Sequence, residues 1–375
     1  MIELFYFVYY QVVGINMSFM PAHLRGLGLT GRQISMVFTV APVMSLAVPL
    51  AWAWIADRTH RHDRILKLVV GGAWIGFTPA LWASSFRGVL AAYAMFAVFS
   101  VGVGGLADAL ALGRVREGAK YGRMRVWGSV GFVASSVVVG ALFTVTGAQA
   151  AGMLAPVVMW LALGAAFLAS LRLRGSGEPA LRPHFDDLKQ LLADPRLRWL
   201  LLAASLHWAC MMPYNVYFGI FLGELGLSPL AWGMAFSVGV IAEMLVLVWF
   251  HDLQARFSLD RLLAAAFVVS ALRWLAVTEV RVPALMIALQ SLHGMTFGMF
   301  WSAAIALLAA MVPTSLRATG QALLVTAINV GAVAGNLVTG RLYDASGPRG
   351  LFLLAAAAEL APLAVVLAAR RRLRP

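Results

Sequence analysis

The chain has few charged residues for its length. Only 12% of its 375 residues are Asp, Glu, Lys or Arg, whereas 61% are hydrophobic. A soluble domain carries about a quarter charged residues, because its surface has to face water. A water-soluble fold of this composition could not cover its apolar interior. A lipid bilayer solvates apolar surface directly, so the composition predicts an integral membrane protein.

Cysteine and the common catalytic motifs are also scarce. The single cysteine, Cys210, excludes a disulfide within the chain and is expected to pack in an apolar helix. The sequence contains no phosphate-binding glycine loop, no His-Glu-x-x-His and no Gly-x-Ser-x-Gly. The cluster His60-Arg-His62-Asp63 is flanked and interrupted by arginines, which repel a metal cation. We therefore expect no cofactor, no metal and no enzymatic activity.

Long apolar stretches dominate the rest of the chain. A membrane-spanning helix needs about 20 mostly apolar residues, and twelve stretches meet this requirement. They lie near residues 2–22, 33–56, 66–85, 88–112, 125–146, 150–170, 197–222, 229–250, 261–279, 282–310, 315–340 and 349–369. The first stretch has no basic segment before it and no clear cleavage site, so it is expected to be retained. The predicted fold class is an all-α membrane protein with twelve transmembrane helices.

The basic residues indicate how these helices are oriented. If the amino terminus lies in the cytoplasm, 22 of the 29 Lys and Arg residues fall in cytoplasmic segments and six in outer segments. Basic residues accumulate on the cytoplasmic side of membrane proteins, so both termini are predicted to be cytoplasmic. The net charge of +13 is then explained by basic residues that hold the cytoplasmic segments beside the anionic inner leaflet. No nucleic-acid partner is therefore expected.

The chain divides into two similar halves. A polar linker at 171–196, with a short interfacial helix after residue 184, separates an N-terminal bundle at 1–170 from a C-terminal bundle at 197–375. Trp54-x-x-Asp57 ends the second span and Trp249-x-x-Asp252 ends the eighth, as expected for a duplicated transporter.

Several short motifs resemble one transporter family. They are Trp54-Ile-Ala-Asp57-Arg58, Leu106-Ala-Asp108, Tyr121-Gly-Arg-Met-Arg125-Val-Trp127-Gly128, Ile241-Ala-Glu243, Leu272-Arg273-Trp274, Leu292-His293-Gly-Met-Thr296-Phe297-Gly298 and Arg317-Ala-Thr-Gly320-Gln321. Together they resemble the major facilitator superfamily, and within it the phenylpropionate-permease and nucleoside–proton symporter group, with the lactose-permease group more distant. In the first motif and the loop that follows it, Trp54 and His60 stand at or near positions where the family has glycines. The resemblance implies two pseudo-symmetric six-helix bundles.

Three ionisable residues lie within predicted spans of the second half. Glu243, Arg273 and His293 fall in the eighth, ninth and tenth spans, where an ionisable group is costly unless it is paired or hydrated. Glu243 either carries a proton or is a neutral structural residue; Arg273 needs an anion such as Glu243 or a substrate carboxylate, or reaches outward to water. A similar Glu, Arg and His in the lactose-permease group imply substrate binding and proton coupling. We predict Glu243 as the proton carrier, with Arg273 and His293 adjusting its pKa.

Two further sets of residues complete the predicted site. Polar and aromatic side chains expected to line a substrate cavity are Tyr10, Asn16, Trp127, His207, Asn215, Gln290, Phe297 and Trp301. Residues expected to act as gates or structural ion pairs near the cytoplasmic ends of the spans are Asp57, Arg58, Asp108, Arg125 and Asp252. The aromatic lining suits a small amphipathic substrate with a ring.

The sequence therefore predicts a secondary transporter of the bacterial inner membrane. It is expected to be a monomer that moves an aromatic acid or nucleoside-like solute, coupled to protons, by alternating access. The alternatives are a proton-driven exporter of drugs or metabolites, diffusion without ion coupling, and, from a different class, an integral membrane transferase.

Overall fold

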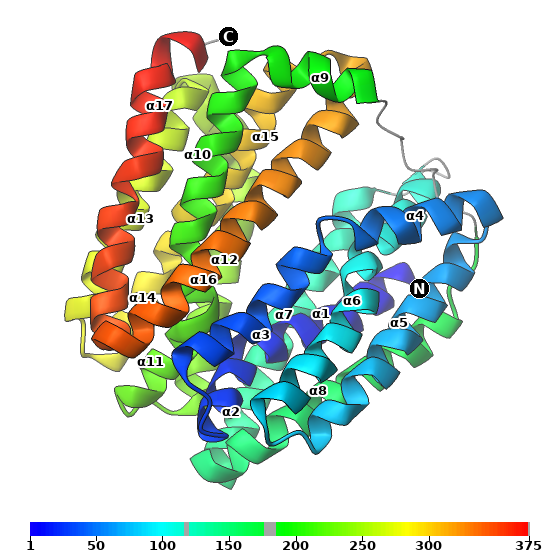
Figure 1. Cartoon of the computed structure of the whole chain (residues 1–375), viewed down its shortest axis with the longest axis vertical. Helices are drawn as coiled ribbons and strands as arrows, with labels where there is room; N and C mark the ends of the chain where they lie inside the picture. The colour runs from blue at the N-terminus through cyan, green and yellow to red at the C-terminus, as the bar shows by residue number, and fades with distance from the viewer. Residues whose placement is uncertain (116–119, 176–184, 374–375) are drawn as a thin grey trace. The chain divides into compact units, whose positions relative to one another are not determined.

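All regular secondary structure in the described residues is helical. The computed structural model describes residues 1–115, 120–175 and 185–373, and no strand occurs in them (Figure 1). The predicted all-α class is confirmed. The helices up to residue 171 are α1 (Ile2–Ser18), α2 (Met20–Gly26), α3 (Gly31–Met44), α4 (Val48–Thr59), α5 (His62–Phe77), the 3-10 turn η1 (Thr78–Leu81), α6 (Phe86–Val115), α7 (Tyr121–Thr146) and α8 (Ala148–Leu171).

The remaining helices follow residue 184. They are α9 (Phe185–Ala193), α10 (Pro195–Met212), the π-turn η2 (Pro213–Tyr217), α11 (Phe218–Glu224), α12 (Pro229–Arg256), α13 (Leu259–Glu279), α14 (Pro283–Leu289), the 3-10 turn η3 (Gln290–Leu292), the π-turn η4 (Gly294–Met299), α15 (Phe300–Met311), the 3-10 turn η5 (Thr314–Leu316), α16 (Arg317–Ala358) and α17 (Leu360–Leu373). Part of the predicted linker, residues 176–184, lies outside the described residues.

Nine helical stretches of the described part are long and apolar enough to cross a membrane. Helices also occupy the predicted first and seventh spans, 2–22 and 197–222, but each of these spans is divided into shorter helices. The first position is interrupted at Phe19 ahead of Pro21, and the seventh at Pro213, where the chain enters a π-turn. The long stretch from Arg317 contains a further break at Gly347, whose φ of 65° precedes Pro348. Proline and a glycine with positive φ thus interrupt the helices of these apolar stretches.

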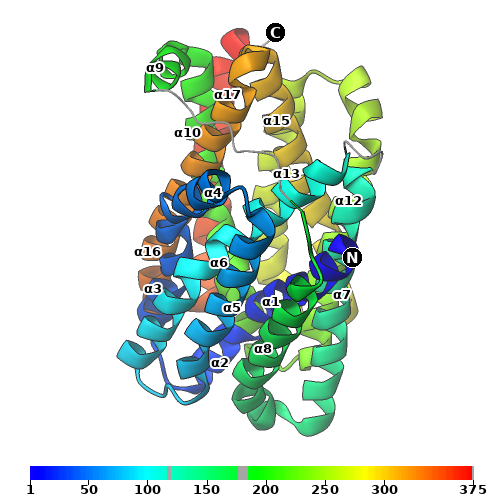
Figure 2. The same ribbon diagram turned by 90° about the vertical axis from the view of Figure 1, so that its right-hand side faces the viewer.

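The chain forms two compact units. The first contains Met1–Ala180 and Val216–Ser237, and the second contains Leu181–Asn215 and Val238–Pro375. In the first unit, α1 packs against α7 and α8, and α5 packs against α6 and α8 (Figure 2). In the second unit, α10 packs against α16 and α17, and α13 against α15, α16 and α17 (Figure 1).

Close helix packing in the first unit depends on glycine. A Cβ atom added to Gly131 on α7 would overlap the carbonyl group of Phe7 on α1. Gly14 on α1 faces α7 in the same way, since a Cβ there would meet Ser135 Oγ and the Phe132 carbonyl. Small residues permit such close approach, which is the main source of packing energy between helices in lipid.

Gly131→Ala is expected to separate α1 from α7 and to destabilise the protein by about 1–3 kcal/mol, because the added methyl meets backbone rather than a movable side chain. The measurement is thermal unfolding of the detergent-purified protein. Gly104→Ala is the matched control, since a Cβ at Gly104 has no atom within 4 Å. Equal melting temperatures for the two variants would show that the close approach is dispensable.

His60 occupies a glycine-like backbone position. It terminates α4 with φ 52° and ψ 32°, and it is the one non-glycine residue with positive φ in the described chain. The left-handed region costs an L-residue roughly 1–2 kcal/mol, and helices commonly end there on glycine. A glycine, which the family resemblance implies at or near this position, would adopt this conformation without strain, whereas His60 adopts it only with strain.

His60→Gly is therefore expected to raise the stability by up to about 1 kcal/mol, after allowing for the greater freedom of glycine in the unfolded chain. His60→Ala keeps the Cβ and should give no such gain. The two variants are compared by thermal unfolding. A melting temperature of the glycine variant at or below that of the alanine variant would contradict the strain argument.

Candidate functional site

The interior of the second unit contains a connected group of polar side chains. It comprises His207 on α10, Ser270 and Arg273 on α13, Gln290 and His293 at η3, Thr296 on η4, and Glu359 between α16 and α17. All are buried, with His293, at 8% exposure, the most accessible. Apolar residues of the same helices surround them, including Phe267, Phe300 and Ala204. Polar groups in such surroundings have to satisfy one another, since water does not reach them.

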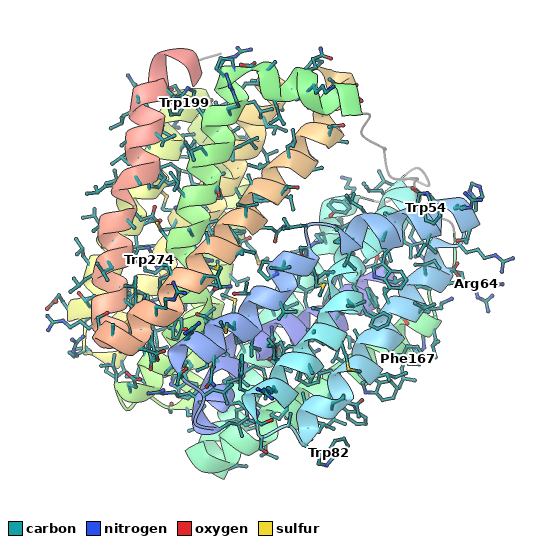
Figure 3. All side chains as sticks on the ribbon, in the orientation of Figure 1. Trp54, Arg64, Trp82, Phe167, Trp199 and Trp274 are labelled. Carbon is teal, nitrogen blue, oxygen red and sulfur yellow. The ribbon has the colours of Figure 1, made fainter. Side chains whose placement is uncertain are left out.

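Arg273 is the centre of this group. Its guanidinium group donates to Gln290 Oε1 at 2.5 Å, to Thr296 Oγ1 at 3.0 Å and to His293 Nδ1 at 3.1 Å. The same group lies over the rings of Tyr214 and Trp274, at 4.3 and 4.7 Å from their centroids (Trp274 is labelled in Figure 3). The buried charge is thus stabilised by neutral dipoles and aromatic faces.

The contact with Arg273 determines the protonation of His293. An arginine side chain has only donors, so His293 Nδ1 has to be the acceptor. The imidazole is therefore the neutral tautomer, with its proton on Nε2. Its ring also stacks on Phe297, with centroids 5.5 Å apart and planes within 7°. In this structure His293 serves as an acceptor for Arg273.

His207 and Glu359 form a second buried contact. His207 Nδ1 lies 2.9 Å from Glu359 Oε2, and both side chains are 0% exposed. The other ring nitrogen, Nε2, lies 3.0 Å from the carbonyl oxygen of Thr296. Thr296 thus contacts both parts of the group, with its hydroxyl on Arg273 and its carbonyl on His207.

The π-turn η4 positions Thr296. A π-turn inserts one extra residue per turn and changes which carbonyl groups bond within the helix, and such turns occur often at functional sites. Glycines on this turn let α12 approach closely: a Cβ at Gly294 would lie 2.6 Å from the Ala242 carbonyl oxygen, and one at Gly298 would lie 3.4 Å from Glu243 Cα. Glu243 on α12 is half-buried beside Gly298.

The first unit has its own polar cluster. Tyr6 donates to Asp108 Oδ1 at 2.5 Å, and Arg125 donates to the hydroxyl of Tyr10. The Arg125 guanidinium group also lies over the ring of Tyr10, at 4.2 Å. Within the described residues Asp108 and Arg125 share no ion pair, and the tyrosines of α1 lie between them. The two charged groups thus share Tyr6, whose hydroxyl bonds to Asp108 and whose ring centroid lies 5.5 Å from the Arg125 guanidinium group.

The structure places the other predicted residues separately. Asn16 accepts from Tyr93, Trp127 packs edge-on against Phe7, Asn215 is half-buried at the π-turn η2, and Trp301 stacks on Phe297. Asp57 bonds to His62 across the turn from α4 to α5, Arg58 lies over Trp54, and Asp252 is exposed on α12. Of the predicted cavity residues, the structure brings His207 and Gln290 into the buried group around Arg273.

Sequence reasoning missed Glu359. This carboxyl group lies inside the twelfth predicted span, 349–369, so the rule that selected Glu243 would also have selected it. Its partner, His207, was predicted to line a cavity, although its nitrogen atoms face Glu359 and Thr296. Both residues thus belong among the candidates for function.

Arg273→Lys is expected to destabilise the protein by about 3 kcal/mol, because one ammonium group cannot replace the planar contacts to Gln290, Thr296 and two aromatic rings. The measurement is thermal unfolding of the purified protein. Arg281→Lys, at an exposed arginine that bonds to nearby carbonyl groups, is the control and should change little. A similar small effect at Arg273 would contradict the role given to its planar group.

Comparison with known proteins gives consistent results. The MFS_1 like family matches residues 1–354. Maltose permease of Geobacillus stearothermophilus is 31% identical over 281 residues, which cover 73% of this chain and 69% of the permease. A probable 3-phenylpropionic acid transporter of Escherichia coli is 27% identical over 321 residues, covering 81% and 80%. The crystal structure of the nucleoside transporter NupG has the same fold, with a TM-score of 0.87, 15% identity and coverage of 98% and 97%.

Proposed function

Since this chain belongs to the MFS_1 like family of major facilitator transporters, an integral multi-pass membrane protein, we propose that it is a proton-coupled symporter of a small organic solute. The observation that carries the coupling is the buried polar group of the second unit. Four ionisable side chains, Arg273, His293, His207 and Glu359, lie buried there in direct or Thr296-mediated contact. Ionisable groups at membrane depth are expensive, and in transporters they mark substrate and proton pathways.

The proposed mechanism is alternating access. The bundles 1–170 and 197–375 rock about a midplane site, and the protonation state of the second bundle selects the direction in which the cavity opens. Glu243 is the proposed carrier, since it is half-buried beside the π-turn that holds Thr296. Arg273 and His293 act on its protonation. The proposed cytoplasmic gate consists of Asp57, Arg58, Asp108, Arg125 and Asp252.

An aromatic carboxylate is the proposed substrate. Tyr10, Trp127, Phe297 and Trp301 keep part of their aromatic surface exposed, which suits a planar apolar group. The probable 3-phenylpropionic acid transporter supports the same class. The terminal nitrogens of Arg273 donate to Gln290, Thr296 and His293 in this structure. A substrate carboxylate would therefore bind in place of one of these three acceptors.

Maltose permease favours a second candidate substrate class, the sugars, because it is 31% identical to this chain. The hydroxyl groups of a sugar would form hydrogen bonds with half-buried side-chain amides such as those of Asn16 and Asn215. Export, diffusion without ion coupling and a membrane transferase are the remaining alternatives. The names of the two relatives, a permease and a transporter, favour transport over the transferase.

Purified protein in liposomes is expected to accumulate labelled 3-phenylpropionate when the outside is more acidic, and a protonophore should abolish this accumulation. Maltose and uridine are measured in parallel. Accumulation of maltose alone would transfer the proposal to the sugar class. Uptake of 3-phenylpropionate that does not depend on the pH gradient would overturn the proposed symport.

Glu243→Gln is expected to abolish accumulation driven by the pH gradient, because an amide cannot take up a proton. Exchange of internal for external probe, which needs no net proton movement, should continue. Glu279→Gln, at an exposed carboxylate to which no transport role is given, serves as the comparison for the carrier role. Gradient-driven uptake by Glu243→Gln at the wild-type level would eliminate Glu243 as the carrier.

A further inference from the structure

The roles proposed for Glu243, Arg273 and His293 leave His207 and Glu359 without a function of their own. The two side chains come from α10 and from the residue between α16 and α17, and each is completely buried. Rings of Phe267 and Phe300 lie 4.8 and 4.5 Å from the imidazole centroid. A charge in such surroundings costs several kcal/mol unless it is paired.

The hydrogen bonds determine how many protons the pair holds. The carbonyl oxygen of Thr296 can only accept, so Nε2 of His207 has to carry a hydrogen atom. The 2.9 Å contact between Nδ1 and Glu359 Oε2 then needs one further proton between two acceptors. That proton is either on Nδ1, giving an imidazolium and a carboxylate, or on Oε2, giving two neutral groups. Both forms contain the same number of protons.

We propose that His207 and Glu359 form a proton-binding site that holds one shared proton and releases it during the transport cycle. When the proton leaves, the lone pair of Nδ1 faces a carboxylate across an apolar pocket, and the contact becomes repulsive. The bond between α10 and the α16–α17 junction then breaks. The pair thus converts the loss of a proton into a change in helix packing.

The surroundings of Glu359 contain alternative partners for the deprotonated state. Its second oxygen, Oε1, is buried without a hydrogen bond, and so are the hydroxyl of Ser270 and the indole nitrogen of Trp274 on α13. Both groups lie beside the carboxyl group. Because these two donors already lie beside the carboxyl group, they can stabilise the carboxylate once the shared proton has left.

Other titratable groups lie near the pair. They are Cys210 on α10, beside Glu359, and His293 beside η4, near His207. Thr296 connects the pair to Arg273, since its carbonyl accepts from His207 and its hydroxyl accepts from Arg273 Nη1. Movement of His207 would therefore be transmitted to the residues that contact Arg273.

The proton site is tested on purified protein in liposomes by infrared difference spectra recorded across a pH titration. Wild-type protein should show coupled changes in carboxyl and imidazole bands, and Glu359→Gln should lose them. Its amide can still donate to Nδ1, so the variant should fold. Glu279→Gln, at an exposed carboxylate that pairs with Arg349, should keep them. A wild-type spectrum without any buried carboxyl or imidazole change would overturn the proposal without use of a variant.

The role in transport rests on the proposed symport and is tested separately with labelled 3-phenylpropionate. Glu359→Gln is expected to lose accumulation driven by the pH gradient and to retain exchange. Retained accumulation would overturn the coupling role. If wild-type protein shows the titration but no gradient-driven uptake of 3-phenylpropionate, maltose or uridine, the proposed symport fails while the proton site stands.

Discussion

The second unit is organised around a positive charge that cannot be removed. Arg273 is completely buried, and a guanidinium group keeps its proton in any protein environment. The surrounding residues therefore have to supply acceptors, and they come from the tenth-span region: Gln290, His293 and Thr296. The ring faces of Tyr214 and Trp274 also lie against the group. The neutral state of His293 and the orientation of Thr296 both follow from this requirement.

Thr296 extends the influence of Arg273 to a second set of groups. Because it lies on a π-turn, its carbonyl is available to His207, which in turn contacts Glu359. Three helical regions and the α16–α17 junction are thus connected by hydrogen bonds within one apolar core. A change of protonation at one end of such a chain alters the partners at the other. This arrangement suits a protein whose second unit has to adopt more than one state.

The first unit relies on a different kind of contact. Its helices approach closely at glycines such as Gly131 and Gly14, and its polar residues Asp108 and Arg125 bond to tyrosines of α1. Close backbone packing and aromatic hydroxyl contacts limit the side-chain movement available there. Among the Asp, Glu, Lys, Arg and His residues that the structure describes, those with 0% exposure, Arg273, His207 and Glu359, belong to the second unit. The chemical asymmetry seen in the sequence is therefore also a structural one.

The membrane class and the helical fold could be predicted from the amino-acid sequence, because a bilayer demands local stretches of about 20 apolar residues. Arg273 and His293 could also be selected as candidates, since an ionisable residue within an apolar stretch is visible without a structure. The tertiary structure decided which polar groups meet. His207 and Glu359 are 152 residues apart, and the pairing depends on helix packing and on the π-turn at Thr296. Neither feature is encoded in local composition, so the sequence could mark Glu359 as a carboxyl group within a span but could not pair it with His207.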